Sequence, residues 1–211
     1  MNVSASKENI LKRIRQSLAQ PTDLPFPASE GVDNVFKPSQ QELEFEFAER
    51  FTKLQGRFSF CESEQQLVEQ LNTLIAARNW QNIYCREDLL KQSLSKNGFN
   101  NFNATDLQSC DASITGCEYL VARTGSMVMS TAQQSGRTVS VYAPVHICIA
   151  YTSQLVYDIK DAINNVKDKY GEVLPSLITL ATGPSRTADI EKTLVVGVHG
   201  PKEVFCFLVE G

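Results

Sequence analysis

Two stretches near the end of the chain are apolar almost without interruption: "SLITLAT" at 176–182 and "VFCFLV" at 204–209. A strand with one face in water alternates apolar and polar residues, whereas a strand covered on both faces does not. We therefore expect both stretches to be inner strands of a sheet that is covered on its two sides.

The first half of the body alternates short strands with helices. The expected strands are "RFSFC" at 57–61 and "NIYC" at 82–85. One helix is expected to begin near Ser63, and another is expected over 87–96. A further helix is expected over 40–54, before the first of these strands. Short strands separated by helices of about ten residues are typical of parallel β-α units.

The second half has a different pattern. From residue 118, short apolar runs follow one another with only turns between them, which predicts hairpins or a mixed sheet. One more helix is expected over about 158–170. Together the two halves predict a three-layer α/β domain whose sheet is mostly parallel but mixed.

The N-terminal part differs from the body. Residues 6–18 have an apolar face with Ser6 as a plausible N-cap, so they predict a short amphipathic helix. Prolines are concentrated in residues 19–39, which predicts an extended linker. We therefore divide the chain into residues 1–39 and a domain over 40–211. Whether the first helix covers its own body or binds a partner remains open.

Charge and cysteine spacing exclude several classes of protein. A net charge of −4 offers no basic field for nucleic acid, and no apolar run is long enough to span a membrane. The N-terminus lacks the apolar core of a signal peptide, so we expect a cytoplasmic protein.

None of the six cysteines forms a Cys-x-x-Cys pair, and several lie in apolar runs. They are expected to be reduced core thiols, without a metal or an iron–sulfur cluster on this chain.

The loop "GPSRTADIE" at 183–191 is the main candidate site. Gly183 would allow a sharp turn, and Ser185 and Thr187 would offer hydroxyl groups before a helix over about 188–196. With the N–H groups of that helix, Arg186 would bind a carboxylate or phosphate. Alternatively, Arg186 locks the loop through Asp189 or Glu191.

Other polar residues are weaker candidates. Thr124, Gly125 and Ser126 lie in "ARTGSMV", which is either part of a binding site or an ordinary hairpin turn. His146 and His199 are either general bases or structural residues. The sequence contains no Walker loop, no Gly-x-Gly-x-x-Gly and no Ser-His-Asp order.

The string "GPSRTADIE…LVVGVHGPKEV" resembles the LUD-domain family. Further similarity lies in "RTGSMVMS", "PVHICIAYTSQLV" and "KENILKRIRQSL", so the resemblance covers nearly the whole chain except the linker. It implies a fold similar to the NagB/RpiA/CoA-transferase group. It also implies a role in oxidising lactate to pyruvate beside two partner proteins, at least one of which carries iron–sulfur clusters. Members of the family often have an acidic residue where this chain has Arg123.

Three functions follow as alternatives. The first is a non-redox subunit or accessory of a lactate-oxidising system, which binds a small anionic metabolite at Gly183–Thr187 with Thr124–Ser126 and His199 nearby. The second is a free-standing isomerase or CoA-transferase-like enzyme, with Arg186 as the anchor for its substrate. The third is an assembly protein without a ligand. A homo-oligomer is compatible with each of them.

Overall fold

The computed structural model describes residues 5–19, 41–188 and 194–211. The chain divides into two compact units, residues 1–38 and 39–211. The first contains helix α1 (Ala5–Ala19), on which Ile10, Leu11 and Ile14 are exposed. This helix begins one residue before Ser6, so Ser6 lies inside it and is not its cap. The predicted linker falls almost entirely outside the described residues.

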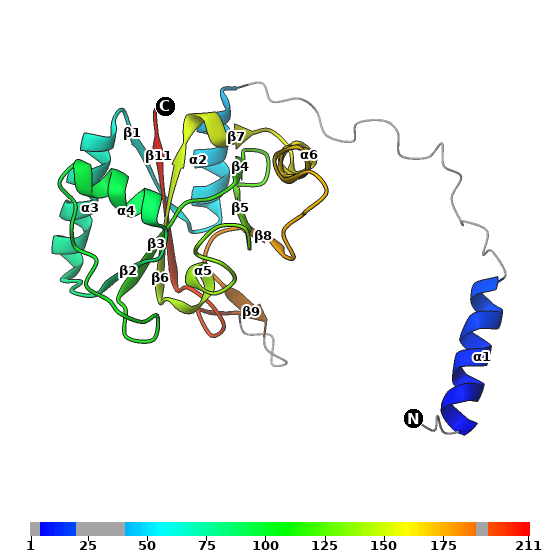
Figure 1. The fold of residues 1–211 in the computed structure, drawn as a ribbon. Coiled ribbons are helices and arrows are strands. Elements are labelled where there is room, and N and C mark those ends of the chain that lie inside the picture. The colour runs from blue at the N-terminus through cyan, green and yellow to red at the C-terminus, as the bar shows by residue number, and fades with distance from the viewer. Residues whose placement is uncertain (1–4, 20–40, 189–193) are drawn as a thin grey trace. The chain divides into compact units, whose positions relative to one another are not determined.

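The second unit is built on a five-stranded, all-parallel sheet. Its strand order is β1-β11-β6-β3-β2 (Figure 1). The bounds are β1 (Arg57–Cys61), β2 (Ile83–Cys85), β3 (Ala112–Thr115), β6 (Val145–Tyr151) and β11 (Glu203–Val209). The fold class is therefore confirmed: it is α/β with a mostly parallel central sheet. The stretch "VFCFLV" is an inner strand, as predicted.

Two helices cover one face of this sheet. They are α3 (Glu64–Arg78) and α4 (Asp88–Lys96), and they contribute Leu67, Leu71 and Leu94 to a core that includes Ile114 and Ile147. Helix α3 begins as expected, because the Ser63 hydroxyl accepts a hydrogen bond from the backbone N–H of Gln66.

The opposite face is covered by helix α2 and a second, mixed sheet (Figure 1). The bounds are α2 (Leu43–Lys53), β4 (Tyr119–Val121), β5 (Ser126–Ser130), β7 (Leu155–Val156) and β8 (Ile178–Ala181), in the sheet order β7-β4-β5-β8. Helix α6 (Ile159–Tyr170) packs on its far side. The short helices α5 (Val139–Tyr142) and η1 (Thr152–Gln154) connect strands. Hairpins and a mixed sheet in the second half were thus predicted correctly.

The prediction that "SLITLAT" is an inner strand is wrong. Strand β8 lies at the edge of the second sheet, antiparallel to β5, and Leu180 is 40% exposed. An unbroken apolar run is expected where both faces of a strand are covered, but here the edge position leaves part of the run in solvent.

The helix predicted over 188–196 is also wrong. The described residues there form two antiparallel strands, β9 (Arg186–Ala188) and β10 (Leu194–Val196). Branched residues such as Thr187, Val195 and Val196 favour extended backbone over helix. Arg186 itself lies in strand β9, so in the described part of this segment it is not next to a helix N-terminus. Asp189 and Glu191 lie outside the described residues.

No helix in the described part of the chain is both long and apolar enough to cross a membrane.

We predict that residues 40–211 fold without the N-terminal segment. The body has its own three core clusters, and none of them includes a residue of α1. A chain that starts at residue 40 should show a single cooperative melting transition close to that of the full chain. Loss of that transition would show that the first helix completes the core.

A second prediction concerns His146, which is 1% exposed and shares a 2.8 Å hydrogen bond between its Nε2 atom and Thr115 Oγ1. Burial lowers the pKa of His146 from 6.5 to about 4. Above pH 6.5 the imidazole is neutral in both the folded and the unfolded chain. As the pH falls from 6.5 toward 4 only the unfolded chain binds the proton, so the free energy of unfolding decreases by about 3 kcal/mol. Chemical denaturation at pH 7 and pH 4 should show a smaller decrease in the free energy of unfolding for His146→Gln than for the natural chain. Equal losses would contradict a neutral buried imidazole.

Candidate functional site

The two predicted loops lie together at the C-terminal end of α2. Gly125 and Gly183 both have positive φ angles, 62° and 77°, and press against that helix end. A Cβ atom on Gly125 would come within 2.7 Å of the Phe51 nitrogen, and one on Gly183 within 2.6 Å of the Leu54 carbonyl oxygen. Both positions therefore require glycine for conformation and for space. The Thr124–Ser126 segment is a hairpin turn between β4 and β5, in agreement with one of its two interpretations.

A chain of hydroxyl groups joins the two loops. Ser126 Oγ lies 2.8 Å from Thr124 Oγ1 and 2.8 Å from Thr182 Oγ1. Ser126 is buried whereas Thr182 is exposed, so the chain of hydroxyls runs from the interior to the surface. The predicted proximity of the two loops is therefore present, but their hydroxyl groups bond to one another.

Arg186 binds the end of α2. Its Nη2 donates a 2.7 Å hydrogen bond to the carbonyl oxygen of Leu54, the residue that caps the helix. The last carbonyl groups of a helix lack partners within it and carry partial negative charge, so a guanidinium is favourable there. This contact favours the interpretation of Arg186 as a clasp, although its partner is a helix end rather than the expected carboxylates. Its role in anion binding stays a prediction.

Ser185 and His199 belong to a separate group. Ser185 donates its backbone N–H to the Pro201 carbonyl and accepts from the Gly197 N–H, both at 3.0 Å. Gly200 packs so tightly on Ser185 that a Cβ atom there would lie 2.7 Å from the Ser185 Cβ atom. The segment around Ser185 therefore supports the turn that carries His199.

His199 lines a cavity of about 590 Å³ together with Lys202, Tyr142, Cys110 and its neighbours in the turn over residues 197–200. Pro144 and Lys202 directly precede β6 and β11, and Cys110 lies two residues before β3, so the cavity lies at the amino end of the parallel sheet. Among the described residues that line it there is a lysine and a histidine but no Asp or Glu. The cavity can therefore attract an anion more readily than a cation.

Lys202 is held in place through its main chain and its neighbour. Its backbone N–H donates a 2.8 Å hydrogen bond to the Pro144 carbonyl. The next residue, Glu203, accepts two hydrogen bonds from Arg78, at 3.0 and 2.8 Å, and pairs with Arg57 at 2.9 Å. The sequence analysis missed Lys202, although its place directly after the "HGP" turn could have indicated it.

A second polar cluster, also missed, lies at the carboxyl ends of β2 and β3. Burial raises the pKa of Glu87, and the Gly116 N–H donates to its carboxylate at 3.1 Å. Burial would likewise raise the pKa of Glu118, but hydrogen bonds from Lys169, Ser130 and Tyr170 outweigh it, so that pKa is lowered. The buried Glu87 Oε1 has no hydrogen-bond partner among the described residues. Isolated glutamates after strands gave no distinctive sequence signal.

All six cysteines are buried and free, as expected for core thiols. Within residues 5–19, 41–188 and 194–211, no three His, Cys, Asp or Glu side chains converge in a way that could hold a metal ion. Whether the chain carries a cofactor stays a prediction.

Known proteins resemble this chain over part of its length. It is 36% identical over 110 residues to lactate utilization protein C of Bacillus licheniformis, covering 51% of this chain and 46% of that protein. It is 35% identical over 109 residues to the protein of the same name from Bacillus subtilis, covering 51% of this chain and 45% of that protein. The match thus spans less than half the length of these relatives.

A solved structure shares the fold. The crystal structure of a DUF162 family protein from Deinococcus radiodurans superimposes with a TM-score of 0.60 at 18% identity, covering 82% of this chain and 99% of that one. The LUD domain family matches residues 86–209, more than half of the sequence, and this range includes Glu87, Glu118 and the described lining of the His199 cavity. This chain therefore belongs to the LUD domain family.

Proposed function

We propose that this protein acts in lactate utilization as a subunit or accessory that binds a small anionic metabolite and carries no redox group. The observation that supports it most directly is the cavity around His199 and Lys202, which is lined by two basic side chains and lies within the matched region. The names of the relatives indicate the pathway. The iron–sulfur chemistry of the system would then belong to partner proteins.

The cavity suits a short hydroxy or keto acid. The Lys202 ammonium would pair with the carboxylate, and His199 and the backbone of the glycine-rich turn would contact the remaining oxygens. The nearby Tyr142 and Val141 would pack on the carbon skeleton. Lactate and pyruvate both have this chemistry.

We predict that lactate or pyruvate binds this cavity and that Lys202→Gln weakens binding about tenfold, the effect of removing a hydrogen bond to a charged group. Isothermal titration calorimetry of the full chain measures the affinity. Lys160→Gln, a change of an exposed lysine on α6, is the matched control and should leave the affinity unchanged. Equal affinities for Lys202→Gln and the natural chain would show that the metabolite does not bind in this cavity.

A further prediction separates the two roles of Arg186. If Arg186 is a clasp, Arg186→Met should lower the free energy of unfolding by about 1 kcal/mol, because the Leu54 carbonyl loses its hydrogen bond, while metabolite affinity stays the same. If Arg186 binds the anion, the same change should weaken binding with little loss of stability. Denaturant unfolding and calorimetry on one variant distinguish the outcomes, and growth of the host on lactate provides the functional readout.

A further inference from the structure

One edge of the parallel sheet is open. In the described part of the chain β1 pairs only with β11. The Cys61 carbonyl accepts a 2.9 Å hydrogen bond from the Glu210 N–H, on the β11 side. Because main-chain polar groups alternate sides along a strand, Phe58 and Phe60 direct their N–H and C=O groups away from β11. Such an edge is a template for another strand.

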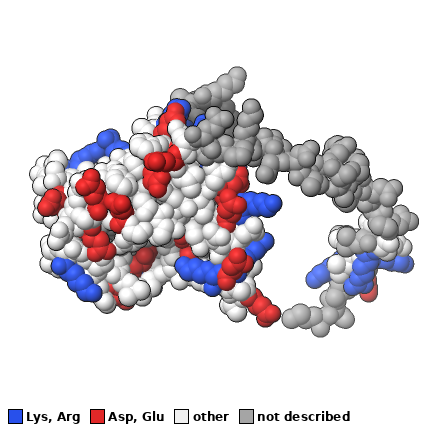
Figure 2. Space-filling model, turned by 90° about the horizontal axis from the view of Figure 1, so that it is seen from above, with Lys and Arg blue, Asp and Glu red and all other residues white. Residues whose placement is uncertain are grey.

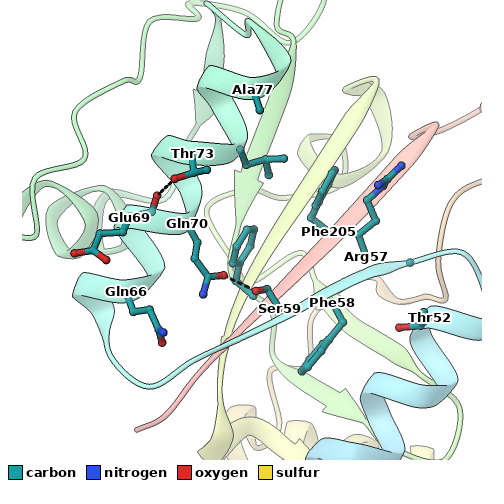
Figure 3. Close-up of a pocket in the computed structure, with 13 residues that line it drawn as sticks. Thr52, Arg57, Phe58, Ser59, Gln66, Glu69, Gln70, Thr73, Ala77 and Phe205 are labelled. Carbon is teal, nitrogen blue, oxygen red and sulfur yellow. Dashed lines mark hydrogen bonds between the residues drawn. The ribbon is translucent and has the colours of Figure 1, made fainter.

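A side chain already occupies one hydrogen-bonding position on this edge. Gln70 of α3 donates from Nε2 to the Phe60 carbonyl at 3.4 Å. Figure 3 shows its second hydrogen bond, in which Gln70 Oε1 accepts from the Ser59 hydroxyl. The donor to Phe60 stands where the N–H of a neighbouring strand would lie. A contact of 3.4 Å is at the long limit for a hydrogen bond, so a main-chain donor could replace it readily.

A groove of about 800 Å³ runs between this edge and α3 (Figure 3). Phe205, Phe207 and Leu74 supply its apolar part, and Gln66, Gln70 and Thr73, which recur about once per helical turn, supply a polar wall. The groove therefore offers an apolar surface to the side chains of a segment that pairs with β1.

A second groove, of about 690 Å³, lies on the α2 side of the same edge. Phe45 and Phe60 are 66% and 41% exposed there, which is unusual for phenylalanine. Glu42, Glu44 and Glu210 also line this groove, and its described lining contains no lysine or arginine. Figure 2 shows acidic side chains spread over the end of the molecule at which β11 finishes.

We propose that the free edge of β1 binds an extended peptide segment of a partner protein, with apolar and basic residues in alternation, as an additional strand of the sheet. Side chains of a strand alternate between its two faces, so the apolar set would enter the α3 groove and the basic set would enter the α2 groove. There the stems of lysine or arginine would cover Phe45 and Phe60 while their charges pair with the glutamates.

A second copy of this chain fits the edge less well. Pairing β1 with its counterpart would bring Glu42, Glu44 and Glu210 of both copies to one side of the joined sheet. Neither copy would then bring a lysine or arginine from its own described groove lining to the acidic lining of the other, so this pairing gains no charge complementarity. The acidic lining therefore favours a basic partner, and this inference does not depend on the proposed metabolite site.

The test uses the full chain and the synthetic peptide acetyl-Val-Lys-Val-Lys-Val-Lys-amide. We expect saturable binding and slowing of amide hydrogen exchange at Phe58 and Phe60 by about tenfold or more, because both N–H groups gain partners. Two N-methylated peptides, one methylated on the lysines and one on the valines, are matched controls, since only one set of peptide N–H groups can face β1. The proposal requires that one and only one of them binds.

Variants of the edge provide the second readout. Gln70→Ala should bind the peptide more tightly, since a competing side chain has been removed, whereas a simple side-chain contact would predict weaker binding. Glu44→Lys should weaken binding about fivefold or more, and Glu172→Lys, on an exposed turn away from the groove lining, should change it little. Equal binding of both N-methylated peptides, or exchange at Phe58 and Phe60 that is already slow in a dimer without peptide, would overturn the proposal.

Discussion

The packing of α2 between the two sheets is the contact on which the rest of the structure depends. Phe47 and Phe51 are fully buried, their rings are stacked with centroids 5.4 Å apart, and they contact residues of both sheets. Fully burying such side chains stabilises a fold by about 2–3 kcal/mol each. The second sheet can cover the first because this helix fills the space between them.

The same helix positions the loops that sequence analysis selected. Its C-terminal end is contacted by Gly125 from one loop, Gly183 from the other and the guanidinium of Arg186. The glycine and arginine pattern that resembles a ligand-binding loop is therefore also explained by packing: the glycines fit closely against the helix end, and Arg186 donates a hydrogen bond to its carbonyl. Residues 183–186 then continue to Ser185 and its contact with the turn that carries His199. One helix end is thus linked through a few residues to the proposed metabolite cavity.

Local signals in the sequence predicted the elements whose structure depends on local causes. The capped start of α3 at Ser63, the amphipathic helix α6 and the apolar strand β11 were all found from periodicity and caps. The errors at β8 and β9–β10 have a different origin. The conformation of these segments depends on whether they lie at a sheet edge and on which distant strand they pair with. The sequence of a short apolar or branched segment contains no signal for either.

The candidate site was only partly accessible to the same reasoning. His199 was selected because an imidazole can act as a general base, but Lys202 resembles any surface lysine until the structure places it in the cavity. Glu203 explains why that position is well defined: two arginines from α3 and β1 hold its carboxylate at the start of β11. Arg57 and Glu203 thereby fix the register between the edge strand and its neighbour. A peptide added to β1 would therefore extend the sheet at a strand that Arg57 already joins to Glu203, the residue that follows Lys202 in the chain.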